Sequence, residues 1–280
     1  MTGAVFILGA GRAGRGLSRA LRASGVAVSG LHGRSAEEKP DSITAGPLPP
    51  AARTAAVILV AVRDGQLEDA LGMLAAAPLA SGAVILHASG SAEPAALERL
   101  RAQGHPCGTF HPLVPLADPP RAAALLRGAW IGIDGDPAAV ATAKELVLRL
   151  GAHALQIPRG EKATYHAAAV FASNFATVLA AVAAGLLTGI GIDRADAWGS
   201  IGALMRGAVT NLEGATAAAA LTGPIVRGDV ATVSAHLAAL QSDPAARRLY
   251  VALSAAAVEL ARQAGTNEEA LGEISALLEA

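Results

Sequence analysis

The feature that most constrains this chain is a glycine pattern close to its start. An apolar run, Ala4 to Leu8, leads into Gly9-Ala10-Gly11-Arg12-Ala13-Gly14, and apolar residues at helical spacing follow. Strand, turn and helix in this order hold a dinucleotide diphosphate at a helix N-terminus. Gly9 allows the tight turn, Gly11 lets the backbone approach the diphosphate, and Gly14 lets the helix pack on the strand. We expect Ala13 to contribute from the same turn; the alternative is an ordinary glycine-rich turn.

The end of the next strand indicates which dinucleotide is bound. NAD-binding folds usually place an acidic residue there, but this chain has His32-Gly33-Arg34-Ser35. A carboxylate would repel a 2′-phosphate, whereas the Arg34 guanidinium and the Ser35 hydroxyl would hold it. Arg12 supports NADP, because a cation at a helix N-terminus opposes the dipole unless an anion lies between them. The alternative is that Arg12 and Arg34 are solvated loop residues.

Strand and helix patterns alternate over the first half of the chain, which predicts a doubly wound parallel sheet of the Rossmann type in an α/β fold. After Pro158 only helical patterns follow. We therefore predict an NADP-binding domain over 1–158 and an all-α substrate and dimerisation domain over 159–280. Further strands are expected at 56–62, 83–87, 106–110, 130–134 and 154–157, and C-terminal helices at 161–187, 194–212, 229–240, 244–264 and 268–278.

Charge and composition limit the kinds of partner that this chain is expected to bind. The formal net charge is −1 and no basic stripe is present, so nucleic acid is not an expected partner. The single cysteine, Cys107, excludes an intramolecular disulfide and is interpreted as a small buried hydrophobe in a reducing compartment. The start of the chain lacks a basic segment typical of a signal peptide, and a cytoplasmic location is expected.

The segment 163–192 contains no charged residue and is long enough to cross a membrane. It also contains Tyr165, His166, Asn174 and several hydroxyl side chains, and it is richer in Ala than in Leu. A helix that is apolar nearly all round is equally typical of the centre of a soluble helix bundle. We therefore expect a buried core helix and no membrane contact.

The first C-terminal helix carries a polar stripe. Lys162, His166, Ser173 and Asn174 recur at helical spacing in a helix otherwise made largely of Ala, Val and Phe. Reduction of a carbonyl with NADPH needs a proton donor and a group that orients the substrate. Lys162 or His166 is expected to deliver the proton, and Asn174 or Ser173 to hold the substrate. The alternative is that these are satisfied structural residues.

Residues at strand ends form a second group of candidates. Ser89 and His111 follow strands whose carboxyl ends should face the nicotinamide, and Ala61-Val62 should border the cofactor through backbone groups. Arg227, in a Gly/Pro loop between helices, is a tentative substrate contact, with a surface or dimer contact as the alternative. No metal site is expected, since neither H-E-x-x-H nor a Cys/His cluster occurs.

In combination these motifs resemble the bacterial Rossmann-like oxidoreductases whose C-terminal half is known as domain of unknown function 2520. The motifs that carry the resemblance are Gly9 to Gly14, His87 to Gly90, Gly108 to Leu113, Lys162 to Ala169, Ser173-Asn174 and Leu221 to Asp229. The resemblance implies a 6-phosphogluconate-dehydrogenase-like arrangement, with an N-terminal NADP domain and a helical C-terminal domain that forms homodimers. Some members look like an alternative ketopantoate reductase. More distantly, the architecture is similar to ordinary ketopantoate reductases, prephenate dehydrogenases and pyrroline-5-carboxylate reductases.

The chain departs from the ordinary ketopantoate reductases at one position. Those enzymes carry a Lys followed four residues later by Asn, whereas here His166 stands four residues after Lys162. The sequence as a whole predicts a cytoplasmic, homodimeric NADPH-dependent oxidoreductase that reduces a small anionic keto or imino compound, with 2-dehydropantoate (ketopantoate) the favoured substrate. The alternative from another class is a non-catalytic NADP-binding sensor or scaffold.

Overall fold

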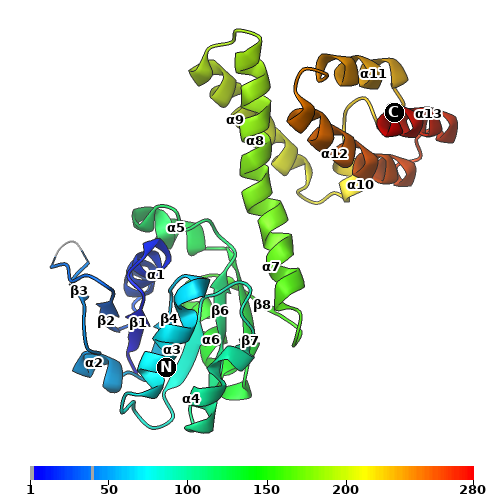
Figure 1. The fold of residues 1–280 in the computed structure, drawn as a ribbon. Helices are drawn as coiled ribbons and strands as arrows, with labels where there is room; N and C mark the ends of the chain where they lie inside the picture. Colours follow the sequence, from blue (N-terminus) through cyan, green and yellow to red (C-terminus); the bar gives the residue numbers. More distant parts are fainter. Residues whose placement is uncertain (1–2, 39–40) are drawn as a thin grey trace. The chain divides into compact units, whose positions relative to one another are not determined.

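The structure, a computed structural model, describes residues 3–38 and 41–280. The described chain forms two compact units, one ending at Asn174 and the other beginning at Phe175. The first unit contains one eight-stranded sheet in the order β3-β2-β1-β4-β5-β6-β7-β8 (Figure 1). Its strands are β1 (Val5–Leu8), β2 (Val28–His32), β3 (Ile43–Thr44), β4 (Val57–Val60), β5 (Val84–His87), β6 (Cys107–Pro112), β7 (Trp130–Gly135) and β8 (His153–Gln156).

Helices cover both faces of this sheet, because its central strands are apolar on both sides. Along β4 all four residues from Val57 to Val60 are buried, and the same is true of β1 and β5. One face packs against α1 (Arg12–Ala23), α5 (Ala122–Leu126) and α6 (Pro137–Arg149). The other packs against α2 (Pro50–Arg53), α3 (Leu67–Ala75) and α4 (Glu98–Ala102). The prediction of a doubly wound α/β sheet is therefore confirmed.

The sheet departs from the all-parallel prediction at one pair of strands. β6 and β7 are antiparallel, and β8 is parallel to β7. The chain leaves β6 at the carboxyl edge of the sheet, where the short turn η3 (Pro119–Arg121) and α5 lie beside α1. It returns at the same edge, where Leu113 N donates to Trp130 O at 2.8 Å. A connection that begins and ends at one edge makes the two strands run in opposite directions.

Two short turns lead into the helices that follow β4 and β5. They are η1 (Asp64–Gln66), before α3, and η2 (Pro94–Leu97), before α4. After β8 the chain enters α7 (Lys162–Val170), and only helices follow. The compact units divide later than the predicted boundary at 158/159, because α7 places the buried side chain of Lys162 in the first unit. The predicted boundary thus marks the change in secondary structure and not the division between compact units.

The second unit is entirely helical in its described residues, as predicted. A small core formed by α11, α12 and α13 includes Val233, Val258 and Ile274. Asp229, Asp243 and Asn267 cap these three helices through their side-chain oxygens. The helices of this unit are α8 (Ala176–Gly189), α9 (Arg194–Asn211), α10 (Ala217–Ala220), α11 (Val230–Ala239), α12 (Pro244–Gln263) and α13 (Glu268–Glu279).

The apolar helix of the sequence is continuous from Lys162 to Gly189, with a π-helical turn η4 at Phe171–Phe175. By length and composition alone it could cross a membrane, which is weak evidence for a span. Only 6% of its apolar window is buried, so the expectation of a buried core helix is wrong for this chain on its own. Large apolar side chains of this helix such as Val178 and Leu186 are 49% and 40% exposed.

Candidate functional site

The first unit contains a cavity of about 1150 Å³ along the carboxyl edge of the sheet. Its walls come from segments far apart in the sequence, which parallel strands bring to a common edge. The lining includes the glycine-rich turn from Gly9 to Ala13, Arg34 and Ser35 after β2, Ala61 and Val62 after β4, and His111 at the end of β6. Nine of the predicted cofactor and substrate residues therefore line one cavity: Gly9, Gly11, Arg12, Ala13, Arg34, Ser35, Ala61, Val62 and His111.

The glycine-rich turn has the geometry that the motif predicts. Gly9 has φ +119°, and a Cβ atom there would collide with the Ala61 carbonyl. A Cβ atom on Gly14 would collide with the carbonyl of Gly9, so this glycine sets how closely α1 approaches β1. A Cβ atom on Gly11 would meet nothing within 4 Å. Gly11 lines the cavity, and its missing side chain therefore leaves space for a ligand and not for packing.

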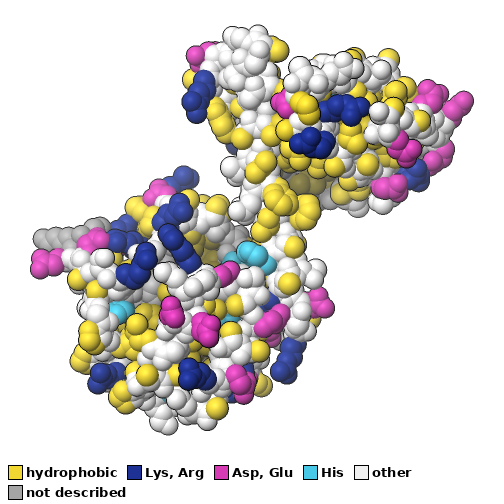
Figure 2. Space-filling view, viewed as in Figure 1, with side chains coloured by type: hydrophobic (Ala, Val, Ile, Leu, Met, Phe, Trp, Pro, Cys, Tyr) yellow, Lys and Arg dark blue, Asp and Glu magenta, His cyan; other side chains and the backbone are white. Residues whose placement is uncertain are grey.

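Basic side chains surround this part of the cavity. Arg12, Arg34 and Arg63 contribute to its lining, and Figure 2 shows Lys and Arg side chains gathered on this side of the first unit. His32 is buried and not free for a ligand, since its Nδ1 lies 2.9 Å from Thr44 Oγ1 and its Nε2 lies 3.1 Å from Gly46 O. The cations at this end fit a polyanionic ligand.

Arg15 also lines the cavity, and sequence reasoning missed it. Its Nε donates to Ala10 O at 3.0 Å, and its guanidinium pairs with Glu37 and with Asp41. The Glu37 carboxylate raises the pKa of Arg15, and Arg15 in turn lowers the pKa of Glu37. Arg15 therefore ties the glycine-rich turn to the segment after β2. The available signal in the sequence was the position of Arg15, one residue past Gly14 and in the first turns of α1.

Lys162, predicted as a proton donor, is fully buried. Its Nζ donates to Ser89 O at 2.8 Å, and its backbone N donates to Glu93 Oε1 at 3.1 Å. Burial lowers the pKa of Lys162 from its ordinary 10.5 to about 8, with Glu93 and Asp134 opposing the shift. The side chain therefore lies inside the first unit, beneath the loop that follows β5, and changes charge near neutral pH.

A cluster of aromatic rings extends from Lys162 to the cavity wall. His111 Nδ1 lies 2.8 Å from the Tyr165 hydroxyl, and the His111 and His166 rings pack edge to face at 5.8 Å. Gly90 makes room for both histidines, because a Cβ atom there would collide with His166 Nδ1 and lie 2.9 Å from His111 Nε2. Burial lowers the pKa of His111 to about 4, so this ring is neutral at physiological pH. We call Lys162, Tyr165, His166 and His111 the polar cluster.

The structure brings together only part of the predicted stripe. Lys162 and His166 join the polar cluster, whereas Ser173 and Asn174 are exposed in the π-helical turn. Both lie beyond the regular part of α7, in a turn with i→i+5 hydrogen bonds, where positions around the helix axis differ from those of an α-helix. The role predicted for Asn174 stays a prediction.

Two other predicted residues lie elsewhere. The Ser89 hydroxyl accepts from Ala92 N at 3.0 Å within its own loop, so its carbonyl and not its side chain reaches the polar cluster. Arg227 belongs to the second unit, where its side chain is 63% exposed and lies 3.9 Å from Asp229. Its role as a substrate contact stays a prediction.

Tyr165 and Gly90 are the members of this site that sequence reasoning missed. Tyr165 lies on the same turn of α7 as Lys162 and His166, so a search for hydroxyl groups on that turn would have found it. Gly90 follows Ser89 after β5, and its role depends on contacts with two distant histidines. Such contacts leave no local pattern in a sequence.

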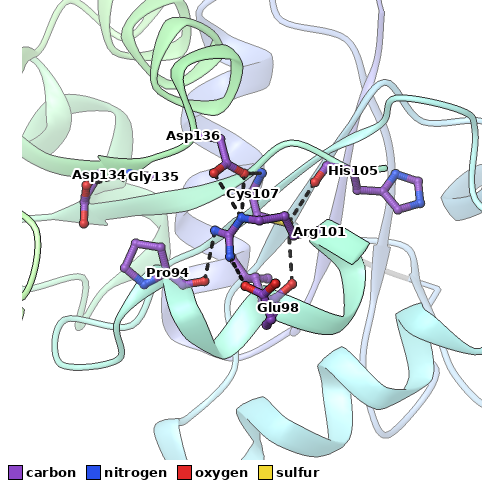
Figure 3. A network of polar contacts seen from close by, with 9 residues as sticks. Pro94, Glu98, Arg101, His105, Cys107, Asp134, Gly135 and Asp136 are labelled. Atoms are coloured by element: carbon purple, nitrogen blue, oxygen red, sulfur yellow. Dashed lines mark hydrogen bonds and ion pairs between the residues drawn. The ribbon is translucent and has the colours of Figure 1, made fainter. Parts of the chain in front are cut away.

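A separate polar network fixes α4 to the start of β6 (Figure 3). Arg101 Nε donates to Asp136, whose Oδ2 accepts from the backbone N of Cys107 at 2.8 Å. Cys107 is buried, as predicted, and burial raises the pKa of its thiol to about 12. The thiol is therefore inert, and this network is structural. Within the described residues, no group of three or more His, Cys, Asp or Glu side chains is arranged to hold a metal ion.

A family model described as "Domain of unknown function (DUF2520)" matches residues 129–277. The chain belongs to this family. No curated protein matches it. Protein TM1727 of Thermotoga maritima has a similar structure, at 23% identity and a TM-score of 0.73 over 92% of this chain and 98% of that one.

Two further solved structures are similar over almost the whole chain. A candidate NADP oxidoreductase from Bacteroides fragilis is 20% identical, with a TM-score of 0.73 over 91% of this chain and 97% of that one. The pyrroline carboxylate reductase of Plasmodium falciparum, solved with NADP bound, is 12% identical, with a TM-score of 0.66 over 99% and 98%. At these identities the likeness establishes a shared fold: a Rossmann-type sheet followed by helices.

Proposed function

We propose that this protein is an NADPH-dependent oxidoreductase that reduces a small carbonyl or imino compound. The observation that carries the proposal is the cavity itself. One end is the glycine-rich turn with its arginines, and the other is His111 of the polar cluster. A dinucleotide needs a diphosphate site and a reactive end, and this cavity offers a polar group for each.

The residues present fit NADP. The open space beside Gly11 would receive the diphosphate at the N-terminus of α1, where backbone N–H groups and the helix dipole favour negative charge. Arg34 and Ser35, which line the cavity after β2, would hold the 2′-phosphate. The fold neighbours support this choice, since one is described as an NADP oxidoreductase and another was solved with NADP. When bound, the cofactor supplies a hydride.

The polar cluster would supply the proton. In this proposal Lys162 is the proton source, because a buried ammonium with a pKa near 8 releases its proton readily. His111 would contact the substrate oxygen or nitrogen, since it is the member of the cluster that lines the cavity. Tyr165 holds the His111 ring through Nδ1 at 2.8 Å, and His166 shares or tunes the proton. Its burial keeps Lys162 out of contact with bulk solvent.

The substrate class follows from the charges at the site. Neutral His111 and cationic Lys162 favour a small substrate with a carbonyl or imine beside a carboxylate. Ketopantoate remains the favoured 2-keto acid, and a cyclic imino acid is the alternative, supported by the fold shared with a pyrroline carboxylate reductase. A prephenate-type substrate is the remaining oxidoreductase alternative.

The test is a turnover screen. The full-length protein is incubated with NADPH and a panel of 2-keto acids and cyclic imino acids, and NADPH loss is followed by absorbance. Wild type should oxidise NADPH with at least one compound, and Lys162→Met should bind NADPH equally well but turn over far more slowly. A protein that binds NADPH tightly yet reduces no member of the panel would support the sensor alternative. Unchanged turnover in Lys162→Met would remove this residue from the mechanism.

We also propose that the chain forms a homodimer through α8 and α9. Large apolar side chains on these helices are exposed, among them Ile190 at 76%, Leu204 at 70% and Val209 at 61%. A second copy would cover them without a membrane. Leu204→Arg should convert a dimer to a monomer in light scattering after gel filtration, whereas exposed Leu148→Arg on α6 should not. A wild-type monomer at micromolar concentration would contradict this proposal.

A further inference from the structure

Three neighbouring strands carry a row of buried polar side chains on one face of the sheet. His87 of β5 pairs with Thr109 of β6, and Thr109 pairs with Asp134 of β7. Directly paired residues point to the same face, so the three side chains lie side by side. This is the face of Ile85 and Cys107, opposite the one on which Leu86 and Ile133 pack.

Most polar atoms of this row lack a hydrogen-bond partner among the described residues, although Asp134 Oδ1 accepts from Gly135 N at 2.7 Å. His87 Nδ1 and Nε2, Thr109 Oγ1 and Asp134 Oδ2 are all buried and have no hydrogen-bond partner among the described residues. His87 and Thr109 are 0% exposed. Leaving one buried polar group unpaired costs about 1–3 kcal/mol, and four such atoms in one row are hard to reconcile with a dry interior. Buried water molecules usually satisfy groups of this kind.

The row lies near the buried ammonium of Lys162, and its Asp134 end lines a cavity. Burial is the main cause of the lowered pKa of His87, and the charge of Lys162 lowers it further. Asp134 opposes the lowering of the pKa of Lys162 by burial, so the row lies within electrostatic reach of the buried ammonium. Asp134 also lines a cavity of about 430 Å³ together with Glu93 and the exposed residue Arg159. Figure 3 shows Asp134 apart from the dashed contacts of the Arg101 network.

We propose that His87, Thr109 and Asp134 hold a chain of buried water molecules that carries protons from solvent in the smaller cavity to Lys162. The inference rests on the proposed function in one respect, that Lys162 gives its proton to the substrate. In that step the Nζ–H bond of Lys162 breaks, and a proton reaches the reduced oxygen or nitrogen by way of His111, which gives up one proton as it takes up another. The neutral amine then takes a proton from the adjacent water, each water takes one from the next, and solvent supplies the last. No electrons move along the chain.

Thr109 is the best point at which to interrupt the row, because valine has the same shape but no hydroxyl. The chain contains only three lysines, Lys39, Lys144 and Lys162, so the ammonium signals of ¹⁵N-lysine-labelled protein are few, and Lys162→Arg assigns the one of interest. The measurement is the exchange of Lys162 ammonium protons with water, by magnetisation transfer below pH 8, without cofactor or substrate. Thr142→Val on α6 is the matched control.

We expect Thr109→Val to slow this exchange about tenfold, the effect of losing one hydrogen bond in the chain, and Thr142→Val to leave it unchanged. A high-resolution crystal structure of wild type should show ordered waters bonded to His87, Thr109 and Asp134. Unchanged exchange in Thr109→Val, a more stable Thr109→Val protein, or a dry row in that crystal structure would overturn the proposal. Because no nucleotide is added, failure here is distinct from failure to bind or oxidise NADPH.

Discussion

The two ends of the large cavity are formed by different kinds of structural feature. At the glycine-rich end the decisive features are backbone geometry and missing side chains, as at Gly9 and Gly11, with arginines around them. At the other end the site consists of buried titratable side chains. Burial lowers the pKa values of His111 and Lys162, which favours their neutral forms. The first end is suited to a ligand that brings its own charge, and the second to moving a proton.

This difference predicts opposite effects for two neighbouring glycines. Gly9→Val should destabilise the fold by more than about 3 kcal/mol, because φ +119° and the Ala61 carbonyl both exclude a side chain. Gly11→Val should fold like wild type but lose NADPH affinity by about a hundredfold or more, equivalent to about 2.7 kcal/mol. Thermal denaturation and calorimetry check the pair. A Gly11→Val protein with normal NADPH affinity would show that the glycine-rich turn does not bind the cofactor.

Stability as a function of pH tests the buried end. Lys162 ionises with a pKa of about 8 when folded and near 10.5 when unfolded, so between these values the unfolded chain binds more protons and stability rises with pH. Relative to Lys162→Met, wild type should gain about 3 kcal/mol from pH 7 to pH 11. The charged groups that act on it are Glu93, Asp134 and Asp64, and the histidines whose pKa values it lowers are His87 and His111.

Exposed Lys144, on α6, provides the control for this experiment. Lys144→Met should keep the pH dependence of wild type, because that side chain is exposed in the folded protein. Denaturation in urea at a series of pH values gives the comparison. Parallel pH profiles for wild type and Lys162→Met would show that Lys162 is not the perturbed group.

At the glycine-rich end, Arg34→Ala should weaken NADPH binding about 10- to 100-fold and NADH binding little, because only NADPH carries the 2′-phosphate. Arg53→Ala, an exposed arginine on α2 that does not line the cavity, should leave both affinities unchanged. Calorimetric titration with each nucleotide decides the matter. Equal losses for the two nucleotides would contradict the assignment of Arg34.

The smallest expected effect concerns two similar His–Tyr pairs. Tyr165→Phe removes the partner of the half-buried His111 at 2.8 Å and should cost about 1–2 kcal/mol. In the second unit His236 Nδ1 lies 2.9 Å from the Tyr250 hydroxyl in an exposed pair, and Tyr250→Phe should cost less. Urea denaturation compares them. Equal costs would mean that burial adds nothing to the pair in the polar cluster.

The same contrast explains how much the sequence could predict. The glycine-rich turn and its strand and helix are local, so Gly9, Gly11 and Gly14 could be assigned roles that the geometry supports. The C-terminal helices were also predicted, because their apolar spacing and their caps, such as Asp229 and Asp243, are local too.

Features that depend on distant contacts were not predicted. The antiparallel turn-back at β7 depends on α5 packing beside α1, and the row from His87 to Asp134 depends on the register of three strands. His87 ends an apolar strand in the sequence, and the lack of partners for its ring nitrogens is seen only in the structure, where Thr109 and Asp134 lie beside it. The π-helical turn that contains Ser173 and Asn174 leaves no clear sign in the sequence.

A crystal structure of the protein grown with saturating NADPH tests the central claim most directly. The account predicts the diphosphate in the space beside Gly11, the 2′-phosphate against Arg34, and the nicotinamide at the end of the cavity where His111 lies. Nucleotide bound anywhere else, or a cavity that stays empty while NADPH is saturating, would contradict it.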